Sequence, residues 1–237
     1  MADNCEELVR LHDRDRYIAT LFAPDHLRPH LFALYAFGVE IARIPTLVSD
    51  PQIGEIRLQW WLDTLSAIEA KQMVDHPVAQ AFAVVVHQFG LPIEHLENFV
   101  EAWRNDLYAD QFPTLFSLES FMAETDAALM QFAAIILDRA AAAKSSAVVG
   151  PAGTAFGLAR LLARPGLDPK FIPPDETVES LKELARQRLQ EARTEKMPAA
   201  LMPAVLPACL TELYLKTPPS ALHSQWVMWR AARRCAI

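Results

Sequence analysis

Apolar residues return every three or four positions along most of this 237-residue chain. The segment 92–110 shows the pattern in its apolar residues, Ile93, Leu96, Val100, Trp103 and Leu107. Residues at this spacing share one face of a helix, and that face has to be buried against a core. The alternation of apolar and polar residues that marks half-buried strands is missing, and the chain has only 7 glycines. The sequence therefore predicts an all-α protein.

Prolines mark most of the boundaries between the expected helices. The 17 prolines fall where helices should begin or end, because proline suits a first turn and breaks a helix interior. The helices expected on this basis cover residues 3–22, 26–44, 52–72, 76–89, 92–110, 117–138, 142–163, 175–195, 198–216 and 219–235. Ser117 and Asp175 are the expected N-caps of two of them. No internal repeat interrupts this pattern, so we expect one domain over residues 1–237.

Composition narrows the class of protein further. A chain that is 52% apolar and 22% charged is globular, and a net charge of −7 argues against a general nucleic-acid binder. Cys5, Cys209 and Cys235 have neither metal-ligand nor disulfide spacing, which favours a reducing compartment. The charged N-terminal segment does not look like a signal peptide, and no uncharged apolar run reaches about 18 residues. We expect a cytoplasmic protein, with peripheral contact to the inner membrane face left open.

Three sequence blocks, in this order, resemble the squalene/phytoene synthase family. They are "LYAFGVEIARI" followed by "GEIRLQWWLDTL", then "NDLYADQFPTLFSLESFM", then "AGTAFGLARLLARPGLDPKFIPPD". Together they span roughly residues 15–180, and the set is more specific than any one block. The resemblance implies a single-domain helical bundle of the isoprenoid-synthase type with a central cavity.

Active members of that family condense two prenyl diphosphates, using Mg²⁺ ions that bridge the diphosphates to two aspartate-rich motifs. Mg²⁺ prefers oxygen ligands, and carboxylates three or four residues apart share one helix face. In this chain, the positions where the resemblance implies acids of the first motif hold Ala42, Arg43 and Thr46. The first motif has therefore lost all of its acids.

The second motif is degraded in the same way. The two acids implied by the resemblance fall on Arg164 and Asp168, and an expected asparagine is Arg160. Of five expected acids, only Asp168 remains. Guanidinium groups bind phosphate oxygens without a metal, so Arg43, Arg160 and Arg164 are candidate ligands for an anionic headgroup.

One branch of the family, which contains mitochondrial complex I assembly factors and bacterial relatives, is the most similar. It also has a Val-Glu-(Ile/Leu)-Ala core, as at 39–42, and lacks the paired aspartates. This resemblance implies a non-catalytic protein that acts in assembly with a protein partner, or in isoprenoid or lipid binding, and no cofactor. The alternative is an active prenyltransferase with an atypical Mg²⁺ site built from Asp106, Asp110 and Asp168. A purely structural interaction protein is a third option.

Other charged residues have two interpretations each. Asp106 and Asp110 are four residues apart and form either a relocated magnesium site or two carboxylates at a helix end. Glu40 lies in an apolar helix and is either a ligand-binding residue or half of a buried ion pair with Arg43 or Arg57, the ion pair being favoured.

Aromatic residues beside these charges raise the same question. Tyr35 lines an isoprenoid tunnel or is ordinary core, and core is favoured. Glu55 and Arg57 precede Trp60 and Trp61, and they line a pocket or face solvent.

The segment 219–235 combines tryptophans with arginines. Trp226 and Trp229 lie close to Arg230, Arg233 and Arg234 in the sequence. Helices of this composition lie on anionic membranes, so peripheral membrane contact is one interpretation. In the other, which we favour, the tryptophans pack inward and the arginines complement the negative end of the helix.

Overall fold

The computed structural model describes residues 2–108 and 110–237, with side chains from Asn4 onward, so position 109 of the predicted 92–110 helix lies outside this range. Every regular element in the described residues is helical, as predicted. The chain divides into two compact units, unit 1 (Met1–Ala109) and unit 2 (Asp110–Ile237). The single domain over residues 1–237 and its central cavity stay predictions.

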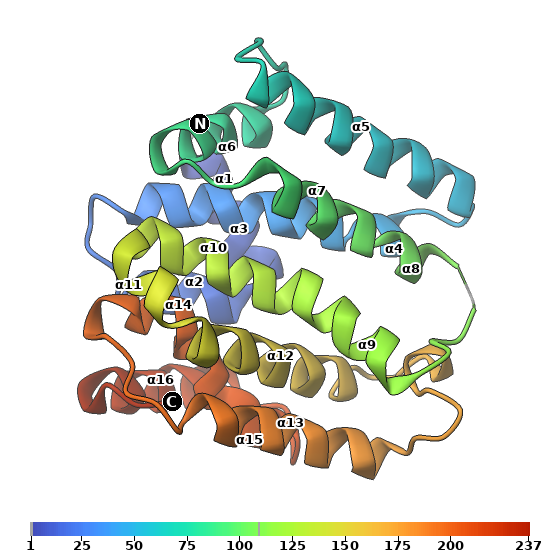
Figure 1. Ribbon diagram of the computed structural model, residues 1–237, viewed down its shortest axis with the longest axis vertical. Helices are drawn as coiled ribbons and strands as arrows, with labels where there is room; N and C mark the ends of the chain where they lie inside the picture. The colour runs from blue at the N-terminus through green and yellow to red at the C-terminus, as the bar shows by residue number, and fades with distance from the viewer. Residues whose placement is uncertain (1, 109) are drawn as a thin grey trace. The chain divides into compact units, whose positions relative to one another are not determined.

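Unit 1 is built around α3. Its helices are α1 (Ala2–His12), α2 (Arg14–Thr20), α3 (Arg28–Ala42), α4 (Ile44–Leu47), α5 (Pro51–Glu69), α6 (Pro77–Phe89), α7 (Ile93–Ala102) and α8 (Arg104–Leu107). Helix α3 packs against α1 and α6, which also contact each other (Figure 1). Its Phe37 stacks on Phe82 of α6 at 4.2 Å between ring centroids and meets Trp61 of α5 edge-on at 5.3 Å. Ten of its fifteen residues are buried, so α3 is a core helix.

Two predicted helices of unit 1 are interrupted by their own capping residues. The predicted 3–22 helix breaks at Asp13, whose side chain accepts a hydrogen bond from the backbone N–H of Arg16 and so starts α2. The predicted 92–110 helix breaks at Trp103 and ends at Leu107, after which Tyr108 is extended.

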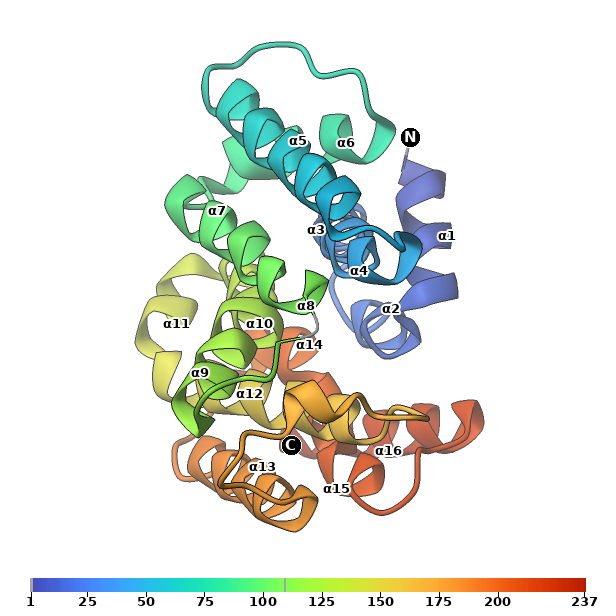
Figure 2. The same cartoon turned by 90° about the vertical axis from the view of Figure 1, so that its right-hand side faces the viewer.

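Unit 2 is built around α12. Its elements are α9 (Leu115–Met122), the π-helical turn η1 (Ala123–Ala127), α10 (Ala128–Leu137), α11 (Arg139–Lys144), α12 (Ser146–Leu162), the 3₁₀ turn η2 (Pro169–Phe171), α13 (Val178–Ala192), the 3₁₀ turn η3 (Ala199–Leu201), α14 (Met202–Val205), the 3₁₀ turn η4 (Leu206–Leu210), α15 (Thr211–Tyr214) and α16 (Ala221–Arg234). Helix α12 packs most extensively against α13 and also contacts η1, α10 and α15 (Figure 2).

Both predicted N-caps are wrong, by two or three residues. Helix α9 begins after Thr114, which is its N-cap. Ser117 is the third residue of the helix, and its side chain completes the capping box with Thr114. Helix α13 begins after Thr177, which forms the same kind of box with Ser180, so Asp175 lies outside the helix. In both cases a threonine satisfies the free backbone N–H groups reciprocally with a serine three residues later.

Helix α12 reaches η1 because it presents glycines to it. A methyl group on Gly153 would lie 2.8 Å from Cβ of Ala127, and one on Gly157 would lie 2.8 Å from Cβ of Asp126. Both distances are shorter than side chains tolerate, so only glycine lets α12 approach this closely.

The run α9–η1–α10 is long and apolar enough to cross a membrane by length and composition, over Leu115–Leu137. Within unit 2, however, 56% of its most apolar window is buried, and α10 and η1 pack against α12. The run therefore has the burial of a core helix.

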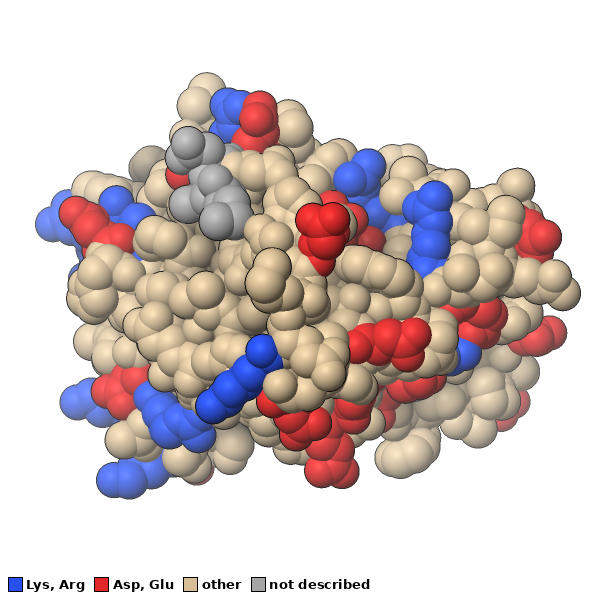
Figure 3. Space-filling model, turned by 90° about the horizontal axis from the view of Figure 1, so that it is seen from above, with Lys and Arg blue, Asp and Glu red and all other residues tan. Residues whose placement is uncertain are grey.

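Figure 3 shows the charged side chains on one face of the molecule. Several acidic side chains lie close together there, and basic side chains are scattered around them. The described residues of this face form no continuous basic surface, in keeping with the net charge of −7.

The close approach of α12 to η1 is testable with two glycines of the same helix. Gly153→Ala is expected to lower the free energy of unfolding by about 1–3 kcal/mol, because the added methyl group overpacks the contact with Ala127. Gly150→Ala is the control, since nothing lies within 4 Å of its added methyl group. It is expected to change the free energy of unfolding by less than about 1 kcal/mol, because the gain in helix propensity is opposed by the steric restriction that Pro151 places on the residue before it. Urea denaturation measures both, and equal effects would contradict the close approach.

Candidate functional site

Tyr35 belongs to a buried polar cluster that also contains Asp13 and Arg16. Only 8% of Asp13, 3% of Arg16 and 2% of Tyr35 is exposed. Nη1 of Arg16 donates to Oδ2 of Asp13 at 2.7 Å, and the guanidinium lies 5.8 Å from the centre of the Tyr35 ring. Burial raises the pKa of Tyr35 well above its ordinary value, which keeps the phenol neutral. Tyr35 is thus a core residue whose ring also faces a buried cation.

The sequence analysis did not single out Asp13 and Arg16. The two lie in the run "DRDR", where the apolar pattern of the predicted 3–22 helix lapses. An aspartate followed three residues later by an arginine, inside such a lapse, is the signal that would have found both the helix break and the ion pair.

Glu40 and Arg43 lie near the C-terminal end of α3. Glu40 is half-buried, and within the part of unit 1 that the structure describes it forms no ion pair with Arg43 or Arg57. The buried ion pair predicted for Glu40 is therefore wrong, because α3 ends two residues later and leaves this carboxylate partly in solvent. His12 of α1 is nearby: burial, and then the charge of Arg43, lowers its pKa, against a smaller opposing effect of Glu40.

The first motif positions, Ala42, Arg43 and Thr46, do not lie on one continuous helix. Ala42 is the last residue of α3, and Arg43 caps it through its backbone N–H. Pro45 occupies the first turn of α4, where proline fits, and the hydroxyl of Thr46 donates to the backbone oxygen of Arg43 at 2.8 Å. This segment therefore forms a capped helix end instead of a row of metal ligands.

The second motif positions lie around the end of α12 in unit 2: Arg160 is in its last turn, and Arg164 and Asp168 follow it. Arg160, in the last turn, lies 5.2 Å from the ring centre of Phe156, and the exposed Arg164 lies 5.9 Å from that of Phe171. Asp168, the one remaining acid, caps η2 by accepting a hydrogen bond from the backbone N–H of Lys170 at 3.0 Å. Asp168 thus has a local structural role.

Glu55 is joined to a residue far away in the sequence. Its carboxylate pairs with Arg104 of α8 and accepts a hydrogen bond from the hydroxyl of Tyr108 at 3.1 Å. That hydrogen bond raises the pKa of Tyr108. Arg104 also pairs with Glu101, whereas Arg57, which the sequence placed beside Glu55, is exposed. No local spacing signals Arg104, because this partnership depends on α5 packing against α8.

Asp106 and Asp110 do not share a helix face. Helix α8 ends at Leu107, so Asp110 lies outside it and the i, i+4 geometry expected from the sequence is wrong. Within residues 4–108 and 110–237, no three His, Cys, Asp or Glu side chains converge so that they could hold a metal ion. Guanidinium groups at motif positions are not Mg²⁺ ligands, so the residues present do not fit the magnesium site of the family.

Comparison with known proteins shows which family contains these motif positions. The sequence model of the squalene/phytoene synthase family matches residues 9–170 of this chain. This match covers more than half of the chain and includes both sets of motif positions.

The matching curated relatives carry one kind of name. "NADH dehydrogenase (ubiquinone) complex I, assembly factor 6" from Homo sapiens is 30% identical over 133 residues, which is 56% of this chain and 40% of that protein. Its homolog from Drosophila melanogaster is 30% identical over 135 residues, 54% of this chain and 40% of that protein. The matched region thus spans well under half the length of these relatives.

Solved structures share the fold over nearly the whole chain. A dehydrosqualene synthase in complex with a ligand has a TM-score of 0.75 at 16% identity, covering 99% of this chain and 96% of that one. Squalene synthase HpnC from Alicyclobacillus acidocaldarius has a TM-score of 0.70 at 18% identity, covering 98% and 93%. The predicted isoprenoid-synthase fold is confirmed.

The buried pair of Asp13 and Arg16 should stabilise unit 1. Asp13→Asn keeps a capping oxygen but replaces the carboxylate that pairs with the buried guanidinium by a neutral amide, so the free energy of unfolding is expected to fall by about 3 kcal/mol. The control is Glu7→Gln, which removes the exposed pair with Arg10 and is expected to cost less than about 0.5 kcal/mol. Chemical denaturation compares the two, and equal losses would contradict the assigned importance of the buried pair.

His12 should make stability depend on pH. Its pKa is lowered from 6.5 in the folded chain, so the unfolded chain takes up the proton at higher pH. Stability is therefore retained above pH 6.5 and lost as the pH falls below it toward the folded pKa. Removing this group by His12→Gln is expected to flatten the fall of the melting temperature between about pH 7 and 5. Parallel curves for the two proteins would show that the surroundings of His12 have no such effect.

Proposed function

This chain belongs to the squalene/phytoene synthase family, and we propose that it is a non-catalytic member that acts in assembly or in isoprenoid or lipid binding. The observation that carries this proposal is the replacement of four of five expected acids, by Ala42, Arg43, Thr46 and Arg164. The fifth, Asp168, caps a 3₁₀ turn.

Arginine at a metal-binding position does more than remove a ligand. Two unit charges 4 Å apart interact by about 4 kcal/mol at an effective dielectric of 20, so the exchange turns attraction for Mg²⁺ into repulsion of similar size. Two such exchanges, at Arg43 and Arg164, argue against the metal-assisted departure of diphosphate. No step through a metal is proposed for this chain, and no cofactor.

The assembly role is supported by the names of the relatives. Curated proteins that match more than half of this chain are named as assembly factors of NADH dehydrogenase complex I. We propose that this chain likewise acts on a protein partner, a subunit of such a complex before it is fully assembled. A cytoplasmic location is part of the proposal, supported by the spacing of the three cysteines.

A retained ligand is the second part of the proposal. Arg43 and Arg160 are half-buried and Arg164 is exposed, and each offers a planar guanidinium that binds phosphate oxygens bidentately. Such a group can bind a prenyl diphosphate or a lipid headgroup. It does not by itself promote departure of the diphosphate from the prenyl chain. An active prenyltransferase built on Asp106, Asp110 and Asp168 is less well supported, since no metal-binding cluster forms in the described residues.

Release of diphosphate from a prenyl diphosphate tests whether the chain is a catalyst. The chain is incubated with farnesyl or geranylgeranyl diphosphate, with and without Mg²⁺, beside an active squalene synthase and an Arg164→Asp variant. We expect no release by the chain, because the charge at Arg43 and Arg164 repels Mg²⁺. Turnover that requires Mg²⁺ would contradict the proposal.

Binding and assembly need separate readouts. An upward shift of the melting temperature by either diphosphate, without turnover, would support the retained ligand site. Native gels of NADH dehydrogenase from cells lacking the chain test assembly, with re-expression as control. An unchanged amount of assembled complex would contradict that role.

A further inference from the structure

The outer face of α16 carries a stripe of large apolar side chains in solvent. Leu222, Trp226 and Trp229 are 77%, 51% and 48% exposed, and with Arg233 they follow the spacing i, i+4, i+7, i+11. Residues at this spacing share one helix face. We call these four residues the α16 stripe.

The tryptophans do not pack inward, so the interpretation favoured from the sequence is wrong. The buried side chains of α16 are Ser224 and Met228, which lie on the opposite face, and α16 packs against η4. Two smaller side chains anchor this helix, and both of its tryptophans remain about half exposed.

The charge on α16 is of one sign. The helix contains no Asp or Glu and carries Arg230, Arg233 and Arg234, in a chain whose net charge is −7. The guanidinium of Arg230 lies 4.5 Å from the ring centre of Trp226, and that of Arg233 lies 4.7 Å from that of Trp229. Among the described residues, none of the three arginines forms an ion pair with a side-chain carboxylate. These three positive charges are therefore available to an anionic partner.

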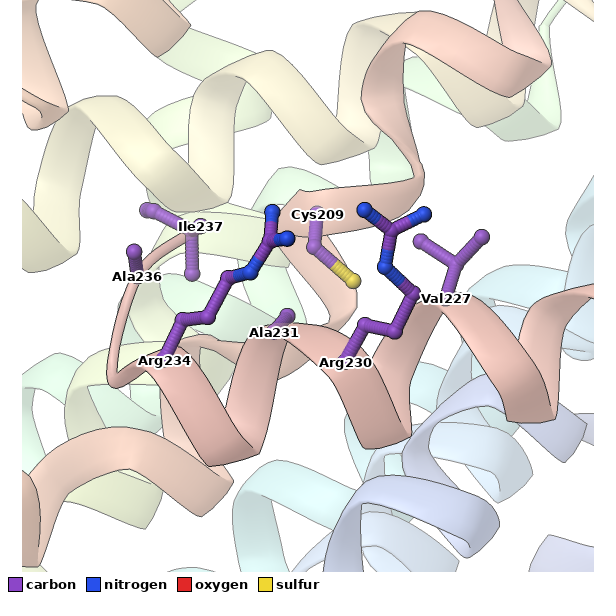
Figure 4. A pocket seen from close by; sticks show the side chains of 7 residues that line it. All are labelled: Cys209, Val227, Arg230, Ala231, Arg234, Ala236 and Ile237. Atoms are coloured by element: carbon purple, nitrogen blue, oxygen red, sulfur yellow. The ribbon is translucent and has the colours of Figure 1, made fainter.

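Two of the three arginines of α16 line a hollow beside the α16 stripe. It has a volume of about 230 Å³, and Arg230 and Arg234 line it together with Cys209 of η4. Figure 4 shows both guanidinium groups projecting from α16 toward the same side as Cys209. Because a water molecule takes about 30 Å³ in the liquid, this hollow admits a phosphate group with several waters.

We propose that α16 is a membrane-docking helix that binds bilayers containing anionic phospholipids. Leu222, Trp226 and Trp229 enter the interfacial layer, where tryptophan combines an apolar ring with a polar N–H. Arg233 meets lipid phosphates at the surface, and Arg230 and Arg234 hold one phosphate headgroup in the hollow.

A second exposed apolar stripe, on α5, shows what is particular about α16. Ile53, Ile56 and Trp60 are also exposed and also share a helix face. That stripe is bordered by Arg57 on one side and Asp63 on the other, so its charge is balanced. An anionic bilayer attracts the α16 stripe and not the α5 stripe, which makes Trp60 a matched control.

Flotation of the full chain with phosphatidylcholine vesicles, with and without phosphatidylglycerol, tests the proposal. We expect binding only to the anionic vesicles, with a blue shift of tryptophan fluorescence and weakening at high salt. Trp226→Ser with Trp229→Ser is expected to weaken binding by about tenfold or more, and Trp60→Ser to leave it unchanged. Arg230→Gln with Arg233→Gln is expected to cost about fivefold per charge.

The charge control removes two exposed cations elsewhere, in Arg14→Gln with Lys144→Gln, and is expected to keep most of the binding. Equal binding to neutral vesicles, or an equal loss in the control, would overturn the proposal. Salt-sensitive binding to anionic vesicles that survives the loss of both tryptophans would overturn the insertion of the α16 stripe, because attraction between charges alone would then explain the binding. Dimerisation through the α16 stripe in sedimentation, without vesicle binding, would assign the stripe to a second copy of the chain.

Discussion

Each unit of this protein depends on one helix that is buried on nearly all sides. In unit 1 it is α3, whose Phe37 stacks on α6 and meets α5 edge-on, and in unit 2 it is α12, which glycines bring close to η1. Helices enclosed in this way have fixed ends, because their side chains cannot slide without opening the core. The positions where the family is expected to carry its acids lie at or just beyond these two ends, from Ala42 onward and after Leu162.

The C-terminal end of a helix presents free carbonyl oxygens and a partial negative charge. A carboxylate placed there is unfavourable unless a cation neutralises it, which is what a bound Mg²⁺ supplies. Arg43 and Arg160 put a permanent positive charge at the same ends. We propose that the loss of the acids and the gain of arginines are one coherent change, in which the chain's own guanidinium groups, instead of a metal ion, complement the helix ends.

The helical architecture was predictable because apolar spacing and proline positions act locally. The breaks were harder: Asp13 divides one predicted helix by capping, and the threonines at 114 and 177 take the capping roles expected of Ser117 and Asp175. Pairs that depend on tertiary packing, such as Glu55 with Arg104, leave no trace in sequence spacing. The sequence indicated that the metal motifs were lost, whereas the outward direction of Trp226 and Trp229 emerged only from the structure.

The central proposal, that arginines stand where the family binds Mg²⁺ and that this chain binds no such metal, is tested most directly by metal binding itself. Mn²⁺ substitutes for Mg²⁺ at oxygen sites and is observed by electron paramagnetic resonance. Mn²⁺ is titrated into the chain with and without inorganic diphosphate, and the spectra are compared with those of protein-free samples. The account predicts that the protein leaves the spectra recorded without diphosphate unchanged and adds no signal of protein-coordinated manganese when diphosphate is present, because its arginines bind phosphate oxygens without the metal. Manganese coordinated by the chain in stoichiometric amount, with or without diphosphate, would contradict it.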